Sequence, residues 1–365
     1  MKNIKSEITL MQYILLIHGV QMGVGVLTLP RELAEKAGTD GWMVLILSWF
    51  LSTTASLIII QVMKKHPDGT ILDLLTHYFG KWVGKAAAII FVLYFAVLAH
   101  VIFAREALFI QAWILSYIEV YVLILLLSIP SYLIVRENIK ILGRYAEFIF
   151  FMTLWTLITY LLPLEYAEWL HLLPVLKEGW MPILTTVRAA IFSFIGFEIA
   201  FFLYPFLQKK EKASIGIVVA NTLSLIMFLI ITIGAFAFYS PDEITLYNEP
   251  TIEMLKVIEF QFIERLEIVV FSFYLFVIST TVLPFMFITV FCTSWLAGKQ
   301  DHRRHLIWFL LIECAVVALF PPSFDRNTLL QQTIEQAGLI VAFAFPLCLW
   351  AYVSLRGLFK RRAIK

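Results

Sequence analysis

Two short segments in apolar surroundings combine glycine with polar or charged residues, and the chemistry they could perform is ligand binding by the backbone. The first segment is Gln21-Met22-Gly23-Val24-Gly25-Val26. The second is Ser193-Phe194-Ile195-Gly196-Phe197-Glu198. Each glycine costs a helix about 1 kcal/mol relative to alanine, so we expect a helix break in both segments. A broken helix exposes N–H groups that attract an anion and carbonyl groups that attract a cation.

A small amino acid carries both charges and fits this chemistry. Its carboxylate would bind N–H groups near Gly25 and Val26, where the missing glycine side chain allows close approach. Its ammonium group would bind carbonyl groups between Phe194 and Gly196. Glu198 then has two interpretations, because it either contacts the ligand or a cation, or it braces the unwound turn as a hydrogen-bonded carboxyl.

The glycines of the first segment also have a simpler interpretation, which is close packing of helices. Gly19 and Gly23 form the small-xxx-small pair that is typical of packed membrane helices. The second segment has its own glycine followed by a carboxylate. This match between the two segments favours a binding site over packing alone.

Ionisable side chains inside hydrocarbon cost several kcal/mol, so each one is a candidate functional residue. Arg105 could pair with Glu198, face a watery vestibule or extend its charge to the membrane interface. His18, His100 and Glu313 are isolated in the sequence, and packing is the simpler interpretation for each of them.

Hydroxyl groups precede Pro284 in a later apolar run, at Ser279, Thr280 and Thr281. Together with carbonyl groups of the first segment they could coordinate Na⁺. Hydroxyls in membrane helices more often bond to their own backbone, and this is the alternative.

The composition makes the lipid bilayer the solvent of this chain. Of its 365 residues, 61% are hydrophobic and 15% are charged, against about 45–50% and 25% in soluble domains. The apolar residues form runs of about 17 to 25, the length that crosses a membrane as a helix. Runs such as 123–135 lack the alternation of a barrel strand, so we predict an all-α membrane protein.

We predict about ten transmembrane helices, near residues 8–29, 41–62, 83–114, 118–135, 144–163, 183–206, 213–239, 266–297, 305–320 and 337–358. With a cytoplasmic amino end, 20 of the 28 Lys and Arg residues lie inside and 6 lie outside. This bias predicts that both termini are cytoplasmic. The basic amino-terminal segment has no small-residue cleavage site, so we expect it to be retained.

The two glycine segments lie in the first and sixth predicted spans, which run in opposite directions. This arrangement predicts a single membrane domain over residues 1–365, built as a 5+5 inverted repeat with discontinuous helices 1 and 6. The two repeats would cover about 8–163 and 183–358.

Three connections are expected to contain helix. Residues 165–180 are predicted to form an amphipathic helix in the interface, and residues 68–80 another short one. Residues 240–267 are acidic, and their helically spaced apolar residues are Ile252, Met254, Leu255, Ile258 and Phe262. This third segment would be either a solvated cap over the bundle or a partner-binding or gating cap.

Several classes of function are excluded by the residues. The net charge is +2 with no basic tract, which argues against a nucleic-acid surface. Cys292, Cys314 and Cys348 form no CxxC pair, so we expect no disulfide framework, metal site or cofactor. The sequence has no nucleophile elbow, HExxH or Walker loop, and we expect no enzyme and no catalytic residue.

Four pieces of sequence together resemble a known family. They are Gly23-Val24-Gly25 with Leu27-Thr28-Leu29-Pro30, the pair Gly41-Trp42, Phe194 to Glu198, and the helix entry after Glu264-Arg265. They resemble the permease-like B subunit of spore germinant receptors, a branch of the amino acid, polyamine and organocation transporter superfamily. The resemblance extends over about residues 8–358.

The resemblance implies a location and partners. It implies a multi-pass protein of the bacterial spore inner membrane that binds a nutrient germinant and works with an A subunit and a lipoprotein C subunit. It also implies a pocket at the glycine segments of spans 1 and 6 with lining from spans 3 and 8. The candidate lining residues in those spans are His100, Arg105, Ser279 and Thr280.

Two alternative functions stay open at this point. Proton-coupled relatives can use a lysine in span 5, and residues 145–162 contain none. This difference favours a receptor over an amino acid secondary transporter, the first alternative. The second is a water or ion channel component, for which the sequence shows scattered polar residues instead of a continuous polar stripe.

Overall fold

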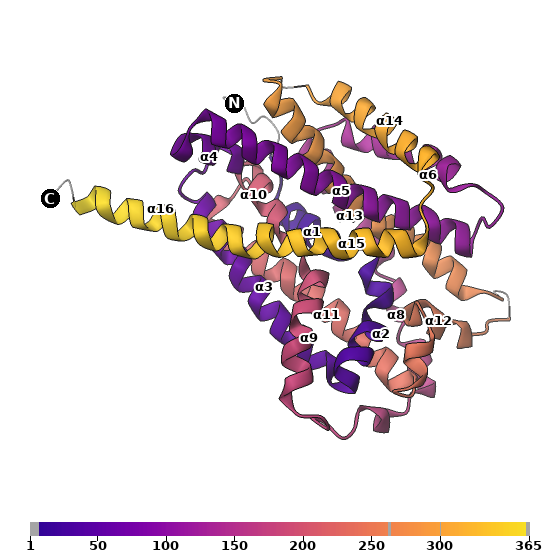
Figure 1. The fold of residues 1–365 in the computed structure, drawn as a ribbon. Helices are drawn as coiled ribbons and strands as arrows, with labels where there is room; N and C mark the ends of the chain where they lie inside the picture. Colours follow the sequence, from indigo (N-terminus) through magenta and orange to yellow (C-terminus); the bar gives the residue numbers. More distant parts are fainter. Residues whose placement is uncertain (1–6, 262–263, 300, 363–365) are drawn as a thin grey trace.

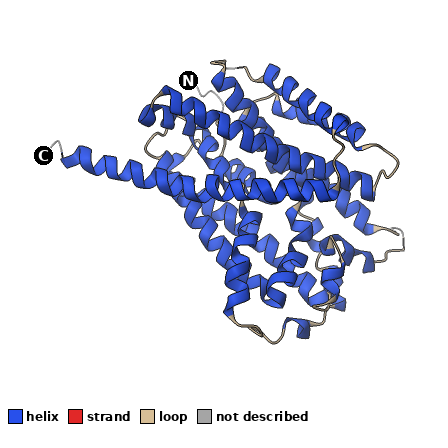
Figure 2. Ribbon diagram, in the orientation of Figure 1, coloured by secondary structure: helices blue, strands red, loops and turns tan. Residues whose placement is uncertain are grey.

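The chain is almost entirely helical in the computed structural model, which describes residues 7–261, 264–299 and 301–362. Figure 2 shows helices joined by loops in this part of the chain. Ile8 forms two backbone hydrogen bonds, one to the Phe206 carbonyl and one from the Gln208 N–H group. These bonds attach the amino-terminal segment to the turn that follows α10 (Ala200–Leu203). The predicted all-α fold class is confirmed.

Figure 1 shows how the helices pack. In chain order the other α-helices are α1 (Leu10–Gln21), α2 (Gly25–Ala37), α3 (Gly41–Met63), α4 (Ile71–Phe79), α5 (Lys81–Trp113), α6 (Val120–Val135), α7 (Ile139–Thr153), α8 (Thr156–Thr159), α9 (Trp180–Phe194), α11 (Ala213–Phe238), α12 (Pro250–Glu253), α13 (Leu266–Leu296), α14 (Arg303–Leu319), α15 (Phe324–Leu339) and α16 (Phe345–Arg362).

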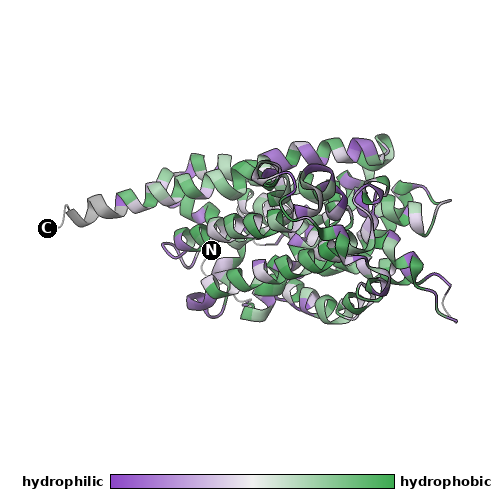
Figure 3. Ribbon diagram, turned by 90° about the horizontal axis from the view of Figure 1, so that it is seen from below, coloured by the Kyte–Doolittle hydropathy of each residue, from purple (hydrophilic) through white to green (hydrophobic). Residues whose placement is uncertain are grey.

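Six stretches of the described chain are long and apolar enough to cross a membrane. They are Gly25–Met63, Lys81–Trp113, Ile139–Tyr166, Lys210–Phe238, Leu266–Leu296 and Phe324–Arg356. A seventh arises if α9 and the following turns to Phe206, which bend by 47°, count as one crossing. Figure 3 shows apolar residues along most of the helices, while polar residues gather in the loops at both ends and along α15. The chain is therefore a polytopic membrane protein.

Helix α13 is the most enclosed of the long helices. Of its most apolar stretch, 78% is buried inside the protein. It packs along α5 and also contacts α1 and α7 (Figure 1). A helix that is apolar on all sides is expected either in lipid or in the centre of a bundle, and α13 lies in the centre. It therefore reaches the first broken helix.

The connections differ from the sequence-based prediction in two of three cases. The short helix predicted over residues 68–80 is confirmed as α4, whose first turn is capped by Thr70 and Asp73. The helix predicted over 165–180 is wrong, since between the 3-10 turn η2 (Leu162–Tyr166) and α9 this segment contains a short 3-10 turn, η3 (Trp169–Leu172), and irregular stretches. Pro163 and Pro174 flank that turn, and proline cannot donate the hydrogen bond that a longer helix requires.

The cap predicted over residues 240–267 is a series of short turns instead of one helix. It consists of η7 (Glu243–Leu246), α12 and η8 (Met254–Val257). Ile252, Met254 and Leu255 are buried, as their spacing suggested, and Phe262 lies outside the described residues. The cap covers one end of the bundle through these apolar side chains.

The last predicted span begins too late in the sequence. We predicted its start near residue 337, but α15 begins at Phe324, where the Ser323 side chain accepts a hydrogen bond from the Arg326 N–H group. α15 continues through a π-helical turn (Ile340–Ala344) into α16. The polar residues of α15 hid this helix from a hydropathy pattern, and two of them, Asn327 and Thr328, accept hydrogen bonds from Arg105.

Candidate functional site

The first glycine segment breaks its helix. α1 ends at Gln21 and α2 begins at Gly25, so Met22 to Val24 separate two half-helices. The carbonyl groups at the break bind side chains of α13 in addition to backbone N–H groups of their own segment. The Tyr274 hydroxyl donates to the Gly23 carbonyl at 2.8 Å, and the Thr281 hydroxyl donates to the Gly19 carbonyl at 2.8 Å. α13 therefore stabilises the break directly.

The second glycine segment also breaks its helix. α9 ends at Phe194, Ile195 is extended, and Gly196 has a φ of +123°, a conformation that favours glycine. Glu198 is 1% exposed. Its carboxylate accepts hydrogen bonds from the Gly196 N–H group at 2.7 Å and from the Tyr94 hydroxyl of α5 at 2.9 Å. Glu198 thus braces the unwound turn, which is one of the two roles expected for it.

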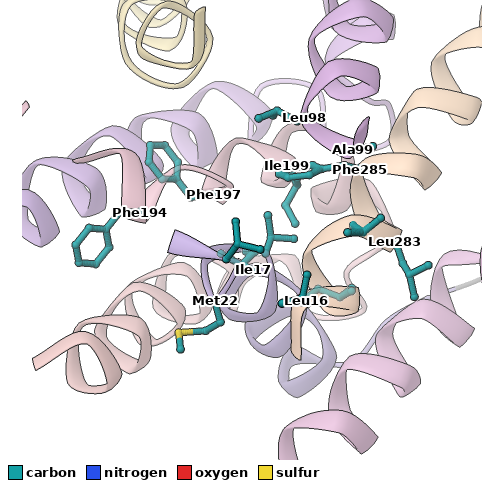
Figure 4. Packing of buried hydrophobic residues seen from close by; sticks show 14 of the residues in the cluster. Leu16, Ile17, Met22, Leu98, Ala99, Phe194, Phe197, Ile199, Leu283 and Phe285 are labelled. Atoms are coloured by element: carbon teal, nitrogen blue, oxygen red, sulfur yellow. The ribbon is translucent and has the colours of Figure 1, made fainter. Parts of the chain in front are cut away.

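The two breaks touch each other. A Cβ atom at Gly196 would lie 2.5 Å from the Cγ1 atom of Val20, a distance that real Cβ atoms do not reach. Figure 4 shows buried apolar side chains of this region, among them Phe194 and Phe197 from the second segment, Met22 from the first break and Ile17 from α1. The fold therefore brings together two segments that are far apart in the sequence.

The buried side-chain amide of Gln21 links the two breaks by hydrogen bonds. The Gln21 amide nitrogen donates to the Phe194 carbonyl at 2.8 Å and to the Asn221 side-chain oxygen at 2.7 Å. Its amide oxygen accepts from the Ser224 hydroxyl at 2.6 Å. Asn221 continues the network by donating to Ser56 of α3 at 3.0 Å. The last carbonyl of α9 thus already accepts one hydrogen bond inside the protein.

The N-terminal end of α2 is open. A Cβ atom at Gly25 would meet nothing within 4 Å, in contrast to Gly19, Gly23 and Gly196. Within the described residues, the N–H groups of Val24 and Gly25 form no hydrogen bond to backbone or side chain. Free N–H groups at a helix N-terminus, next to empty space, can bind an anion.

The cap formed by η7, α12 and η8 lies close to this opening. The Thr251 hydroxyl of α12 donates to the Val26 carbonyl at 3.1 Å. Next to it, burial raises the pKa of the Glu249 carboxyl, and the charges of Arg105 and Arg31 oppose that rise. The cap therefore contacts the first turn of α2.

Three of the candidate lining residues bond elsewhere. Arg105 donates to the side chains of Asn327 and Thr328 on α15, each at 2.7 Å, and does not pair with Glu198. His100 lies 2.7 Å from Glu313 of α14. Ser279 bonds to Tyr145 of α7 at 2.6 Å. None of these hydrogen bonds reaches the two breaks.

Thr280 is the candidate lining residue that does reach a break. Its hydroxyl lies 3.3 Å from the Gly19 carbonyl and 2.6 Å from the carbonyl of Val277 in its own helix. The bond to Val277 is the alternative expected for hydroxyls in membrane helices.

Tyr94, Asn221, Ser224 and Tyr274 contribute to the site and were not among the predicted residues. Asn221 and Ser224 are fully buried polar residues one helical turn apart in an otherwise apolar run. That spacing was a usable signal. Tyr94 and Tyr274 gave none, because a tyrosine in a membrane helix is common and its partner depends on the fold.

The site and fold define a class of protein. The chain is a polytopic helical membrane protein in which two interrupted helices meet in the interior and leave backbone groups beside open space. Such discontinuous helices are typical of transporter-like folds.

The chain belongs to the spore permease family. The family profile, described as "Spore germination protein", matches residues 7–325. The resemblance drawn from the short motifs is thereby confirmed at the level of the family.

Three relatives illustrate the range of similarity. The chain is 25% identical to spore germination protein GerQB of Bacillus cereus, with 96% of this chain and 97% of the relative covered. It is 26% identical to spore germination protein YndE of Bacillus subtilis, with 94% and 95% covered. It is 28% identical to spore germination protein A2 of Bacillus subtilis, with 73% and 74% covered.

Replacing Gly196 by alanine should destabilise the protein. The alanine would have to adopt a positive φ, and its methyl group would have to displace Val20. We therefore expect the free energy of unfolding to fall by about 1–3 kcal/mol, with a lower midpoint of thermal unfolding in detergent. Gly234→Ala is the matched control, because a Cβ atom there meets only ordinary contacts at 3.7 Å or more. Equal midpoints for the two variants would mean that the breaks are not in close contact.

Replacing Gln21 by methionine should also destabilise the protein. The substitution keeps the side-chain length but leaves the Phe194 carbonyl and the Asn221 and Ser224 side chains without this partner, at a cost of about 1–3 kcal/mol. Gln61→Met is the control, since the exposed Gln61 amide accepts only from Trp350. Unfolding midpoints of both variants decide the matter, and an unchanged Gln21→Met midpoint would contradict the bridging role.

Proposed function

We propose that the chain is the nutrient-binding B-type subunit of a spore germinant receptor, with the ligand held between the two helix breaks. The observation that carries this proposal is the open N-terminal end of α2, where the Val24 and Gly25 N–H groups are unbonded beside empty space. Free N–H donors at the start of a helix are suited to a carboxylate.

The other end of the site suits an ammonium group. The Glu198 carboxylate and the Ile195 carbonyl lie in the second break, while the Phe194 carbonyl is occupied by Gln21. Since the breaks are in contact, one small zwitterion can face both. A small amino acid or a similar nutrient is therefore the proposed ligand.

The proposed architecture is a ten-helix 5+5 inverted repeat with both termini cytoplasmic. Beyond the long apolar stretches, α1 and α6 are short apolar helices that complete further crossings if lipid covers them. α14 would supply another crossing. The meeting of breaks in the first and sixth spans supports this arrangement, because inverted repeats place equivalent segments on either side of a shared site.

The proposed signal is a shift between conformations. A nutrient that binds one arrangement of the breaks more tightly than another changes the population of the two, and partners read that change. Membership in a family described as spore germination proteins supports a role in the spore inner membrane with A and C subunits. Two relatives of this chain, spore germination proteins A2 and GerQB, have spore germination in their names as well.

A thermal-unfolding screen of the purified chain against amino acids, sugars and nucleosides tests this function. A nutrient that binds the folded state raises the unfolding midpoint by mass action. The same nutrient is then offered to proteoliposomes that contain the chain. We expect binding without accumulation, whereas gradient-driven uptake would make the chain a secondary transporter, and ion conductance would make it a channel.

Filling the space beside Gly25 should abolish nutrient binding without unfolding the protein. Gly25→Ala adds a methyl group that meets no protein atom, so it should weaken binding by about tenfold or more through contact with the ligand alone. Gly25→Leu should remove binding. Nutrient-induced stabilisation measures both, with Gly234→Ala as the control. Wild-type binding by Gly25→Leu would exclude a ligand at this position.

Removing the charge of Glu198 should weaken binding of an ammonium-bearing nutrient. Glu198→Gln keeps one hydrogen-bond acceptor for the turn but removes the negative charge, and we expect the Kd to rise by about tenfold or more. Tyr94→Phe removes one hydrogen bond and keeps the carboxylate, so it should raise the Kd less. Titrations of both variants compare these effects, and an unchanged Kd in Glu198→Gln would show that a neutral group suffices.

A further inference from the structure

A cavity lies apart from the helix breaks, between α5, α6, α7 and α13. Its volume is about 210 Å³. Most of its walls are apolar, formed by side chains such as Phe103, Leu127, Leu275 and Leu283. Its polar lining consists of Glu106, Ser131, Tyr145, Ser272 and Ser279.

Glu106 is the unusual residue in this cavity. It is 4% exposed, and in the part of the chain that the structure describes its carboxyl has no hydrogen-bond donor. The hydroxyl groups around it are engaged elsewhere. Ser131 and Ser272 donate to carbonyls of their own helices, and Tyr145 and Ser279 bond to each other at 2.6 Å.

No basic side chain neutralises this carboxyl. The cavity lining contains no lysine, arginine or histidine. Arg105 is adjacent in sequence, but successive residues of a helix point about 100° apart, and its guanidinium group is bonded to Asn327 and Thr328 on α15. A buried carboxylate without a partner is costly, so its positive partner must come from outside the chain or be a proton.

The cavity lies next to the lipid-facing surface. Phe276 in its wall is 48% exposed, and Ile129 and Leu133 on the adjoining surface of α6 are 59% and 51% exposed. These apolar side chains belong to membrane helices, so lipid covers them. A ligand that partitions into the membrane can therefore reach Glu106 from the side.

We propose that this cavity binds a small aliphatic amine in its ammonium form. The ammonium group would pair with the Glu106 carboxylate and use the Tyr145 and Ser279 oxygens as further acceptors. The alkyl chain would lie against the apolar wall. A carboxylate in an apolar pocket favours an alkylammonium ion, because the alkyl chain packs against the apolar wall and the ammonium group neutralises the buried carboxylate.

This site is separate from the proposed nutrient site. Its polar residues lie on α5, α6, α7 and α13, and neither Gly25 nor Glu198 lines it. Its existence does not depend on what binds at the helix breaks.

Equilibrium binding of radiolabelled hexylamine to the purified full chain in detergent tests the proposal, with binding to empty micelles subtracted. We expect one saturable site in the wild-type protein, a Kd at least about tenfold higher in Glu106→Gln, and little displacement by hexanol. Glu267→Gln is the matched control, because Glu267 is also 4% exposed but has its own partner in Arg265. It should bind like the wild type.

A second variant tests the cavity itself. Leu127→Trp keeps Glu106 but fills the space, and it should also reduce hexylamine binding. The proposal is overturned by the absence of a saturable site in the wild type or by equal binding in Glu106→Gln. Equal displacement by hexanol would overturn it too, because the cavity would then be a pocket for apolar chains. Loss of binding in Glu198→Gln but not in Glu106→Gln would place the amine at the helix breaks instead.

Discussion

The candidate site depends on one close contact, which requires a residue without a side chain. Gly196 combines a φ of +123° with a position where a Cβ atom would overlap Val20. Because this contact is possible, the next residue of α1, Gln21, can donate its amide hydrogen to the carbonyl that ends α9. The two helix breaks thereby become one structural unit, although Gln21 and Phe194 are 173 positions apart.

This unit is attached to most of the helices around it. Glu198 is bonded to α5 through Tyr94, the Gln21 network reaches α11 and α3, and Tyr274 holds the first break from α13. Buried polar networks of this kind favour a small number of discrete arrangements, because a partly satisfied network is costly. A ligand that changes the hydrogen bonds at either break would therefore shift several helices together, as the proposed receptor role requires.

Much of the fold and part of the site could be predicted from the sequence. The apolar runs gave the helices, and the glycines at 23, 25 and 196 gave the breaks, because both depend on local properties of the chain. The bracing of the turn by Glu198 was one of two expected roles. The partners were not predictable: Tyr94 for Glu198, Asn221 for Gln21 and Asn327 for Arg105 are each set by tertiary packing. The start of α15 and the loop over residues 165–180 were predicted wrongly for a related reason. Their conformation depends on neighbouring residues more than on hydropathy.

The most direct test is an experimental structure of the purified chain determined with a nutrient found by the binding screen. The account predicts ligand density between the half-helices, with an anionic group at the Gly25 N–H group and a cationic group facing Glu198. Density for unbroken first and sixth helices, or for the nutrient at a position away from both breaks, would contradict it.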